Sequence, residues 1–279
     1  MPMSNQQFLS FDHALTTRKY LLYQPVDLPP QAPVVFVLHG YTDNAANMRD
    51  FSHMDAIADR YGFAVVYPQG TIDKQGKRFW QVGYAFHVDE TVDDVGFLVT
   101  LAHHLQSSHD FAPRHTYMTG MSNGGDMAYL MACQRPNVFT AIAPVVGTLM
   151  QWIDDAYPTP QPIPILAFNG TADTVTDYAG DPHNRDGWGA YLGVDAIMAY
   201  WQRAHGSTGS NVTLLTHPDG TDPRSVAHHM YETGDSASQL QLYQIIGGGH
   251  DWSGGTDTLF FDASDIIGQF FARLSRINP

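Results

Sequence analysis

Residues Thr119 to Met127 read TGMSNGGDM and gather three glycines around one serine, Ser122. Glycine weakens helices and strands alike, so this crowding indicates a backbone under a local constraint. Apolar residues before and after the stretch predict a strand over 116–120 and a helix over 123–134. A serine at a tight strand-to-helix turn, in the pattern G-x-S-x-G, is typical of a nucleophile elbow. The pattern alone is short enough to occur by chance, so its flanks decide what it means.

Working outward, the chain alternates buried strands with helices. Continuous apolar runs at 34–38, 63–68, 141–147 and 163–170 are typical of parallel strands covered on both faces. Helices are expected at 45–60, 93–106, 123–134, 191–204 and 264–274, and further strands at 19–23, 212–215, 230–232 and 240–245. The alternation predicts an α/β fold with a mostly parallel central sheet and helices on both faces. Ligands of such sheets bind at the carboxyl ends of the strands.

Composition narrows the class of protein. The chain has 279 residues, and we expect one α/β catalytic domain over 1–279. Hydrophobic residues make up 43% and charged residues 15%, which suits a large core and gives no signature of disorder. The formal net charge of −14 argues against nucleic acid as a partner and disfavours anionic membranes, because phosphate binding requires clustered Lys and Arg.

Cysteine content and hydropathy bear on location. Cys133 is the only cysteine, so no internal disulfide is possible, and we expect it to be a buried apolar side chain rather than a nucleophile. No apolar run approaches the length of a membrane span, and the first residues do not show the pattern of a signal peptide. We therefore expect no membrane association and a cytoplasmic location, or a secreted one if a leader has been removed.

A serine hydroxyl needs a base, and the base needs an orienting acid. The nucleophile elbow places both after the serine in chain order, acid first. Asp173 follows the strand at 163–170 directly and is the best acid, with Asp177 as the alternative. For either residue, the competing interpretation is an aspartate that only forms a turn.

The base is expected at His250, in the stretch IIGGGHDWSGG. It follows the last predicted strand and lies in a loop too rich in glycine to belong to the core. The chain has 14 histidines, so rivals need weighing. His217, His228 and His229 lie near the late strands, but none has such a loop beside it.

An oxyanion hole needs two backbone N–H groups aimed at the developing negative charge. One is expected from Asn123, the residue after the nucleophile. The other is expected from the loop that follows the first buried parallel strand, LHGYTDN at 38–44, where we choose the N–H of Tyr41.

Taken together, the motifs resemble the esterase family of polyhydroxybutyrate depolymerases and feruloyl esterases, members of the α/β-hydrolases. The resemblance runs from about residue 18 to residue 274. It rests on HGYTDN, VDDVGFLVTL, GMSNGG, NGTADTVTDY, GGGHDWSGG and FFARL, in that order. It implies that Ser122, Asp173 and His250 form the catalytic triad. The sequence departs from the family in two ways. Ser253 stands where relatives often have proline. Secreted polymer-degrading relatives also have a signal peptide, extra cysteines and a binding domain that have no counterpart in this sequence, which weakens any expectation of activity on solid polyester.

Aromatic residues near these motifs are candidates for a substrate pocket. Trp80, Trp252 and Tyr41 are expected to line it, whereas Phe79 suits the core equally well. An aromatic wall would suit a phenolic acyl group or a flat apolar ester.

We expect no cofactor and no metal, because the one cluster of candidate ligands matches no standard zinc or calcium spacing. That cluster consists of His103, His104, Asp181, His183 and Asp186.

The expected function is that of a serine carboxylic ester hydrolase acting through an acyl-enzyme. The expected substrates are short-chain or aromatic, feruloyl-like esters or hydroxyalkanoate oligomers. A thioesterase or peptidase on the same fold is an alternative, since a fold does not fix its chemistry. A non-catalytic binding module is a second alternative, and it would be expected to lack part of the triad. Whether segment 177–190 forms a lid, and the oligomeric state, stay open.

Overall fold

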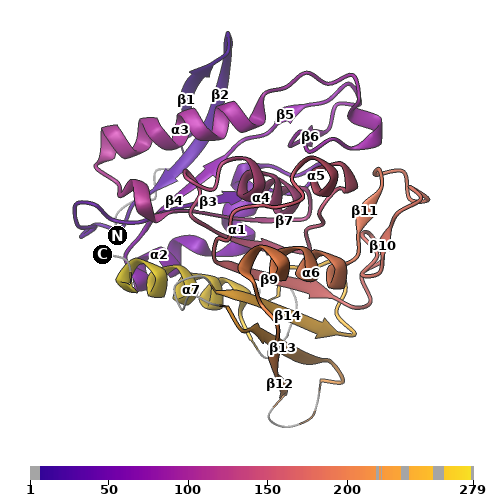
Figure 1. Ribbon diagram of the computed structural model, residues 1–279. Helices are drawn as coiled ribbons and strands as arrows, with labels where there is room; N and C mark the ends of the chain where they lie inside the picture. Colours follow the sequence, from indigo (N-terminus) through magenta and orange to yellow (C-terminus); the bar gives the residue numbers. More distant parts are fainter. Residues whose placement is uncertain (1–6, 218–219, 221, 234–238, 254–260, 278–279) are drawn as a thin grey trace.

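The chain builds one ten-stranded sheet in the computed structural model, which describes residues 7–217, 220, 222–233, 239–253 and 261–277. Six central strands run parallel, and two strands at each edge pair antiparallel (Figure 1). In spatial order they are β1 (Leu9–His13), β2 (Thr16–Tyr23), β4 (Ala64–Pro68), β3 (Val34–Leu38), β7 (Thr116–Met121), β8 (Ala141–Val145), β9 (Ile165–Gly170), β14 (Leu240–Ile246), β13 (Ser225–Tyr231) and β12 (Ser210–Thr216).

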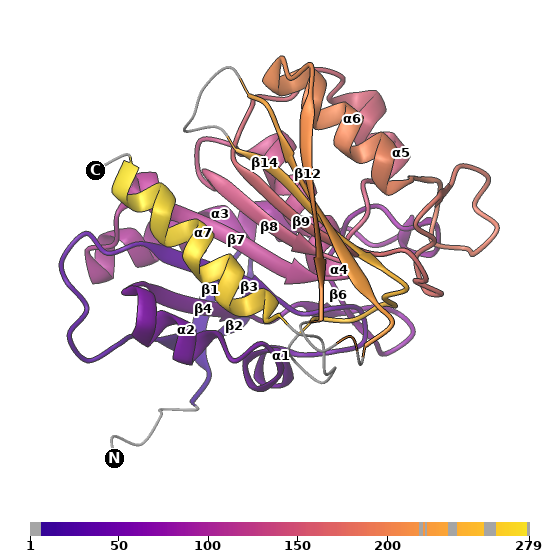
Figure 2. The ribbon, with the colours of Figure 1, turned by 90° about the horizontal axis from the view of Figure 1, so that it is seen from below.

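Helices cover both faces of this sheet (Figure 1 and Figure 2). On one face lie α1 (Ala45–Ser52), α2 (Met54–Tyr61) and α7 (Ala263–Ile277). On the other lie α3 (Asp94–His109), α4 (Asn123–Gln134), α5 (Gln151–Ala156) and α6 (Val194–His205). The predicted α/β fold, with a mostly parallel sheet between two layers of helices, is confirmed. None of the described helices is both long enough and apolar enough to span a membrane.

Strand β3 shows how the sequence serves two cores at once. All five of its residues are buried. Because side chains alternate across a strand, Val34, Phe36 and Leu38 join the core beneath α3, α4 and α6, while Val35 and Val37 join the core beneath α1, α2 and α7. A central parallel strand therefore reads as an unbroken apolar run.

The structure differs from the expected elements in two informative places. The helix expected at 45–60 is split by His53, whose φ of 52° lies in the left-handed region and ends α1 before α2 begins. Strand β1 was not predicted. Its hairpin turns at Ala14 and Leu15, with φ of 45° and 67°, and these residues lack the Asn-Gly or Asp-Gly signal that marks such turns.

Several short elements complete the edge where the strands end. They are β5 (Thr71–Ile72) paired with β6 (Arg78–Phe79), β10 (Gly180–Asp181) paired with β11 (Tyr191–Leu192), and the 3-10 helix at Ala85–His87. A further 3-10 helix, at Pro113–His115, lies at the opposite edge, directly before β7. The loops after β3, β7, β9 and β14 leave their strands in the same direction, because these four strands are parallel. The candidate site residues lie in these loops.

Candidate active site

Ser122 occupies a sharp corner between β7 and α4. Its φ of 54° and ψ of −121° are a conformation that an L-residue adopts only under strain, which costs on the order of 1–3 kcal/mol. Two backbone bonds impose the corner. The N–H of Ser122 donates to Val145 O at 2.9 Å, and its carbonyl accepts the first helical bond, from Asp126 N at 2.8 Å. The side chain is half-buried, as a nucleophile reached from solvent must be.

The glycines around the serine allow close backbone approach. A Cβ on Gly124 would lie 2.4 Å from Leu38 O, at the end of β3. One on Gly120 would lie 2.7 Å from the backbone of Gly124, and one on Gly125 would lie 2.9 Å from Gly147 Cα. These contacts are the local constraint that the crowded glycines indicate in the sequence. Three glycines are required because strand, helix and neighbouring loop meet here without room for side chains.

Asp173 and His250 meet across 77 positions of sequence. His250 Nδ1 lies 2.7 Å from Asp173 Oδ2, and the hydroxyl of Thr176 donates to the same oxygen at 3.2 Å. The other oxygen, Oδ1, accepts the backbone N–H groups of Val175 and Thr176. The carboxylate is thus held from both sides and oriented toward the imidazole.

The two loops that carry this pair are bonded to each other. The N–H of Ala172 donates to Gly248 O at 2.8 Å, and the N–H of Gly247 donates to the Thr171 hydroxyl at 2.9 Å. A Cβ on Gly170 would lie 2.4 Å from Gly248 O, so β9 and the histidine loop are in backbone contact. Within the histidine loop, a Cβ on Gly248 would lie 2.4 Å from the Ile245 side chain, so packing constrains Gly170 and Gly248 at this contact.

The local environment keeps Asp173 ionised. Partial burial by itself would raise the pKa of its carboxyl, but the hydrogen bond and charge of His250 and the two backbone N–H donors outweigh burial and lower the pKa. An ionised carboxylate accepts the Nδ1 proton and leaves Nε2 of His250 as the free basic nitrogen.

The loop after β3 lies against the elbow. A Cβ on Gly40 would lie 3.6 Å from Ser122 Cβ. In the described parts of the chain, the next backbone N–H, that of Tyr41, has no protein acceptor. The N–H of Asn123 lies in the first turn of α4, where helical N–H groups have no intrahelical partner. Both groups selected from the sequence are thus free donors close to Ser122.

His39 and Asn123 hold this arrangement from beneath. His39 is fully buried, its Nδ1 bonds to Gly40 O at 2.7 Å, and its Nε2 accepts the N–H of Gly70 at 3.0 Å. Burial lowers the pKa of His39 to about 4, so the ring is neutral and can accept that bond. The Asn123 amide accepts Trp80 N at 2.7 Å and donates to Trp80 O at 3.0 Å.

Two of the three aromatic residues expected in the pocket are buried structural residues instead. Trp80 is fully buried and donates Nε1 to His39 O at 3.0 Å. Trp252 is also fully buried, packs in the core beneath α7 and donates Nε1 to the Ser264 hydroxyl at 2.8 Å. Their placement as pocket residues is therefore wrong. An indole N–H needs a partner when buried, and each ring is anchored by one on the protein side.

Beside Tyr41 lie two accessible aromatic rings from segments that the motifs do not mark. Tyr41 is half-buried, and its ring lies 5.7 Å from Phe86 and 5.9 Å from Trp188, between ring centres. Phe86 is exposed and Trp188 half-buried, and their rings are 5.6 Å apart. A backbone bond from Ala85 N to Trp188 O joins the two segments at 2.9 Å. Phe86 and Trp188 follow no periodic pattern in the sequence, so only the fold brings them to Tyr41.

The rival site residues have other partners. His228 and His229 bond to the side chains of Gln241 and Gln244 on the neighbouring strand β14. Asp177 accepts the N–H of Ala179 within a turn. Asp181 accepts the N–H groups of His183 and Asp186, also in a turn. Within the described ranges, no three His, Cys, Asp or Glu side chains gather as a metal site requires.

The fold and the elbow define an α/β-hydrolase. The acetyl xylan esterase from Aspergillus awamori has the same fold, with a TM-score of 0.62 and 16% identity over 91% of this chain and 93% of that one. A carboxylesterase from Bacillus cereus gives a TM-score of 0.55 with 12% identity over 92% and 94%.

Sequence similarity then gives the family. The family model described as Esterase PHB depolymerase matches residues 18–158, and the chain belongs to this family, which makes it a carboxylic ester hydrolase. It is 28% identical over 264 residues to the putative esterase NocK of Nocardia uniformis subsp. tsuyamanensis, covering 86% of this chain and 72% of NocK. It is 24% identical to poly(3-hydroxyalkanoate) depolymerase C of Paucimonas lemoignei, covering 81% of this chain but 56% of that protein.

Proposed function

We propose that the chain hydrolyses carboxylic esters through an acyl-enzyme formed on Ser122, with His250 as the base and Asp173 as the acid that orients it. The observation that carries the proposal is the 2.7 Å bond between Asp173 and His250, on two loops at the same sheet edge as the strained serine corner.

In the acylation step, Ser122 Oγ attacks the ester carbonyl carbon while His250 Nε2 removes the hydroxyl proton. The carbonyl oxygen becomes an oxyanion and accepts the N–H groups of Tyr41 and Asn123. One such donor typically stabilises the transition state by about 3–4 kcal/mol. The intermediate then breaks the bond to the alkoxy oxygen, His250 returns its proton to that oxygen, and the alcohol leaves.

In the deacylation step, water takes the place of the alcohol. His250 accepts a proton from water, the hydroxide oxygen bonds to the acyl carbon, and the same two N–H groups stabilise the second oxyanion. Collapse breaks the bond to Ser122 Oγ, which recovers its proton from His250. The products are one carboxylic acid and one alcohol for each ester and water consumed.

The substrate class follows from the rings beside the oxyanion loop. Tyr41, Phe86 and Trp188 form a cluster of rings that begins in the oxyanion loop, and we propose that it receives a flat or short apolar acyl or alcohol group. Curated relatives include an acetylxylan esterase/xylanase, poly(3-hydroxybutyrate) depolymerase and feruloyl esterases. We propose short-chain esters, feruloyl-like esters and hydroxyalkanoate oligomers as the substrates to compare.

The direct test replaces the nucleophile. Ser122→Ala is expected to lower kcat for p-nitrophenyl acetate by about 10⁴-fold or more, because the serine and its base act as a unit. The same substitution should abolish labelling by a fluorophosphonate probe, measured as the mass added to the intact protein. Ser108→Ala, an exposed serine on α3, is the matched control and should keep full activity. Turnover at the wild-type rate by a folded Ser122→Ala protein would overturn the proposal.

A further inference from the structure

A second hollow lies beyond the oxyanion loop, at the edge of the sheet where β2 meets β4. It is a cavity of about 410 Å³, and its walls come from β2, from the segment after β4 and from the β5–β6 hairpin. The lining residues are Phe8, Thr17, Arg18, Lys19, Gln69, Gly70, Thr71, Ile72 and Arg78. We call it the β2–β4 cavity. The mechanism proposed above uses none of these side chains.

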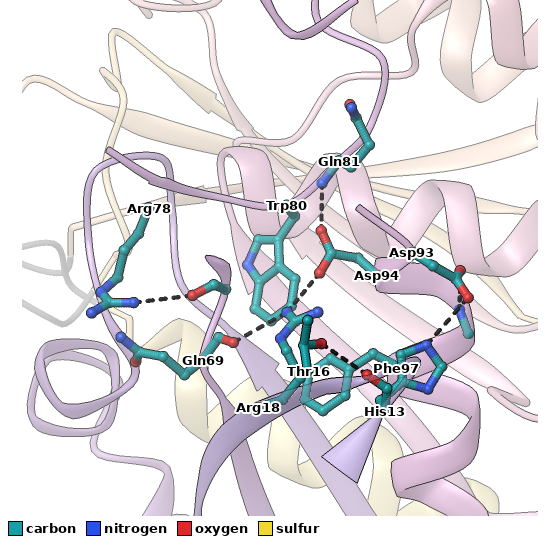
Figure 3. A network of polar contacts seen from close by, with 12 residues as sticks. His13, Thr16, Arg18, Gln69, Arg78, Trp80, Gln81, Asp93, Asp94 and Phe97 are labelled. Carbon is teal, nitrogen blue, oxygen red and sulfur yellow. Dashed lines mark hydrogen bonds and ion pairs between the residues drawn. The ribbon is translucent and has the colours of Figure 1, made fainter. Parts of the chain in front are cut away.

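The charge of this cavity is opposite to that of the molecule. The chain has 28 acidic and 14 basic residues, yet the lining contains Arg18, Lys19 and Arg78 and no Asp or Glu. Asp94 forms an ion pair with Arg18 from the protein side, at 2.6 Å, and compensates its charge. The positive charges of Lys19 and Arg78 remain to attract an anion. The Arg78 side chain donates to the carbonyl of Gly70 and, among the described residues, has no acidic partner (Figure 3).

Arg18 is built into the cavity wall. Its side chain is 4% exposed, and the guanidinium stacks 4.0 Å above the ring of Phe97. A single nitrogen, Nη2, makes both protein bonds, to Asp94 and to the carbonyl of Gln69 (Figure 3). Within the described ranges, Nε and Nη1 have no acceptor. The buried hydroxyl of Thr71 also has no partner there. A buried arginine with free N–H groups and an unpaired hydroxyl are donors that favour an oxyanion.

Two apolar side chains, Phe8 and Ile72, also line the cavity. Phe8 is half-buried, and Ile72 is 55% exposed, on the strand next to the charged residues. A ligand that fits both parts carries one anionic head and a short apolar chain. Such a molecule is the acid released by hydrolysis of an aliphatic ester.

The cavity is also joined to the oxyanion loop. The carbonyl of Arg78 accepts the N–H of Thr42 at 2.8 Å, and Gly70 donates to His39 at 3.0 Å. Thr42 follows Tyr41 directly. A ligand in the cavity would therefore contact residues that are hydrogen-bonded to the segment proposed to supply one oxyanion donor.

We propose that the β2–β4 cavity binds a short aliphatic carboxylate through Lys19, Arg78 and the free N–H groups of Arg18. That the carboxylate is a hydrolysis product rests on the proposed function, whereas the anion site itself does not. Failure of one is therefore separable from failure of the other, because binding at Ile72 and turnover by Ser122 are measured independently.

The test follows the Ile72 methyl resonance in protein with ¹³C-labelled isoleucine methyl groups, assigned with Ile72→Val. Hexanoate is titrated at constant ionic strength, so that general screening does not change. The resonance should shift along a saturable curve. Acetate should bind more weakly than hexanoate, because it lacks the chain that contacts Phe8 and Ile72. Inorganic phosphate binding more tightly than hexanoate would overturn the choice of a carboxylate.

Matched variants decide whether the charges act locally. Lys19→Gln with Arg78→Gln should weaken hexanoate about five- to tenfold, in line with two exposed ion pairs. Lys77→Gln removes the same charge from the neighbouring exposed residue, which does not line the cavity, and should change affinity less than twofold. Asp12→Asn removes a carboxylate bonded to Thr17 at the rim and should tighten binding. Equal weakening by Lys77→Gln and by the combined Lys19→Gln and Arg78→Gln variant, or no Ile72 shift with hexanoate, would overturn the site.

Discussion

At the scale of single residues, the side chain of Tyr41 anchors the loop that we propose as the source of one oxyanion donor. The Tyr41 hydroxyl donates to Asp73 Oδ2 at 2.8 Å, and His87 Nε2 bonds to the same oxygen at 3.0 Å. Asp73 is buried, and although burial by itself would raise its pKa, the bonds from His87, Lys77 and Tyr41 lower that pKa to about 2. A permanent carboxylate thus fixes the ring of Tyr41, and with it the position of the backbone N–H.

Tyr41→Phe tests that dependence. The substitution keeps the ring and the backbone donor but removes one bond to a charged group, worth about 1.5–3 kcal/mol of stability. We expect kcat to fall about three- to tenfold while KM changes little, because a misplaced oxyanion donor acts on the transition state. Steady-state kinetics on p-nitrophenyl acetate measure both constants.

The control is a second tyrosine with the same chemistry. Tyr23 donates its hydroxyl to Asp59 at 2.7 Å, away from the catalytic loops. Tyr23→Phe should lower stability without changing kcat. Equal kcat for Tyr41→Phe and Tyr23→Phe would show that the Asp73 bond only supports the fold.

At the scale of elements, the junction of β3, β7 and α4 is one of the closest backbone contacts among the candidate site loops. Gly124→Ala would place a methyl group 2.4 Å from the carbonyl oxygen of Leu38 and 2.8 Å from that of His39. Both obstacles are backbone atoms in the sheet, which cannot rotate away. The helix and the strand must therefore move apart.

We expect Gly124→Ala to lower the free energy of unfolding by about 3 kcal/mol, at the upper end of the cost of overpacking. Urea denaturation measures it. Gly249→Ala is the matched control, because a Cβ there meets nothing within 4 Å and the backbone needs no positive φ. It should change stability by less than about 0.5 kcal/mol. A Gly124→Ala protein as stable as Gly249→Ala would contradict the packing argument.

At the scale of the whole molecule, two buried groups give stability opposite dependences on pH. Burial lowers the pKa of His39 to about 4, so between about pH 6.5 and 4 the unfolded chain binds a proton that the folded one does not, and stability falls as pH falls. Burial raises the pKa of Asp126 to about 6, against bonds from Thr148 and Tyr84. Between its ordinary pKa of 3.8 and about pH 6, the folded state therefore holds a proton that the unfolded chain has lost. The free energy of unfolding falls as pH rises through this range.

Replacing either group should reveal the pH dependence of stability that the other group contributes. His39→Asn should remove a term of up to about 3 kcal/mol that destabilises the protein between pH 6.5 and 4. Asp126→Asn should make the loss of stability on acidification steeper than in the wild type. Urea denaturation at pH 4.5, 5.5 and 6.5 gives the slopes. Parallel slopes for the two variants would mean that neither group titrates as its burial implies.

The sequence was sufficient wherever a local pattern carried the physical constraint. Continuous apolar runs predicted the parallel strands. The glycines around Ser122 indicated close backbone approach, because the sequence shows directly which residues lack a Cβ. Asp173 and His250, selected from the sequence because each follows a strand end, lie 2.7 Å apart, since parallel strands end at the same edge.

Only the tertiary structure decided which aromatic rings are buried and which lie accessible beside Tyr41. Trp80 and Trp252 lie close to the motifs in sequence, yet both point into cores and are anchored by His39 and Ser264. Phe86 and Trp188 are far apart in sequence and meet beside Tyr41 through a loop contact. The direction of a side chain depends on which neighbours exclude water from it. That is a property of packing between distant segments, and no local pattern records it.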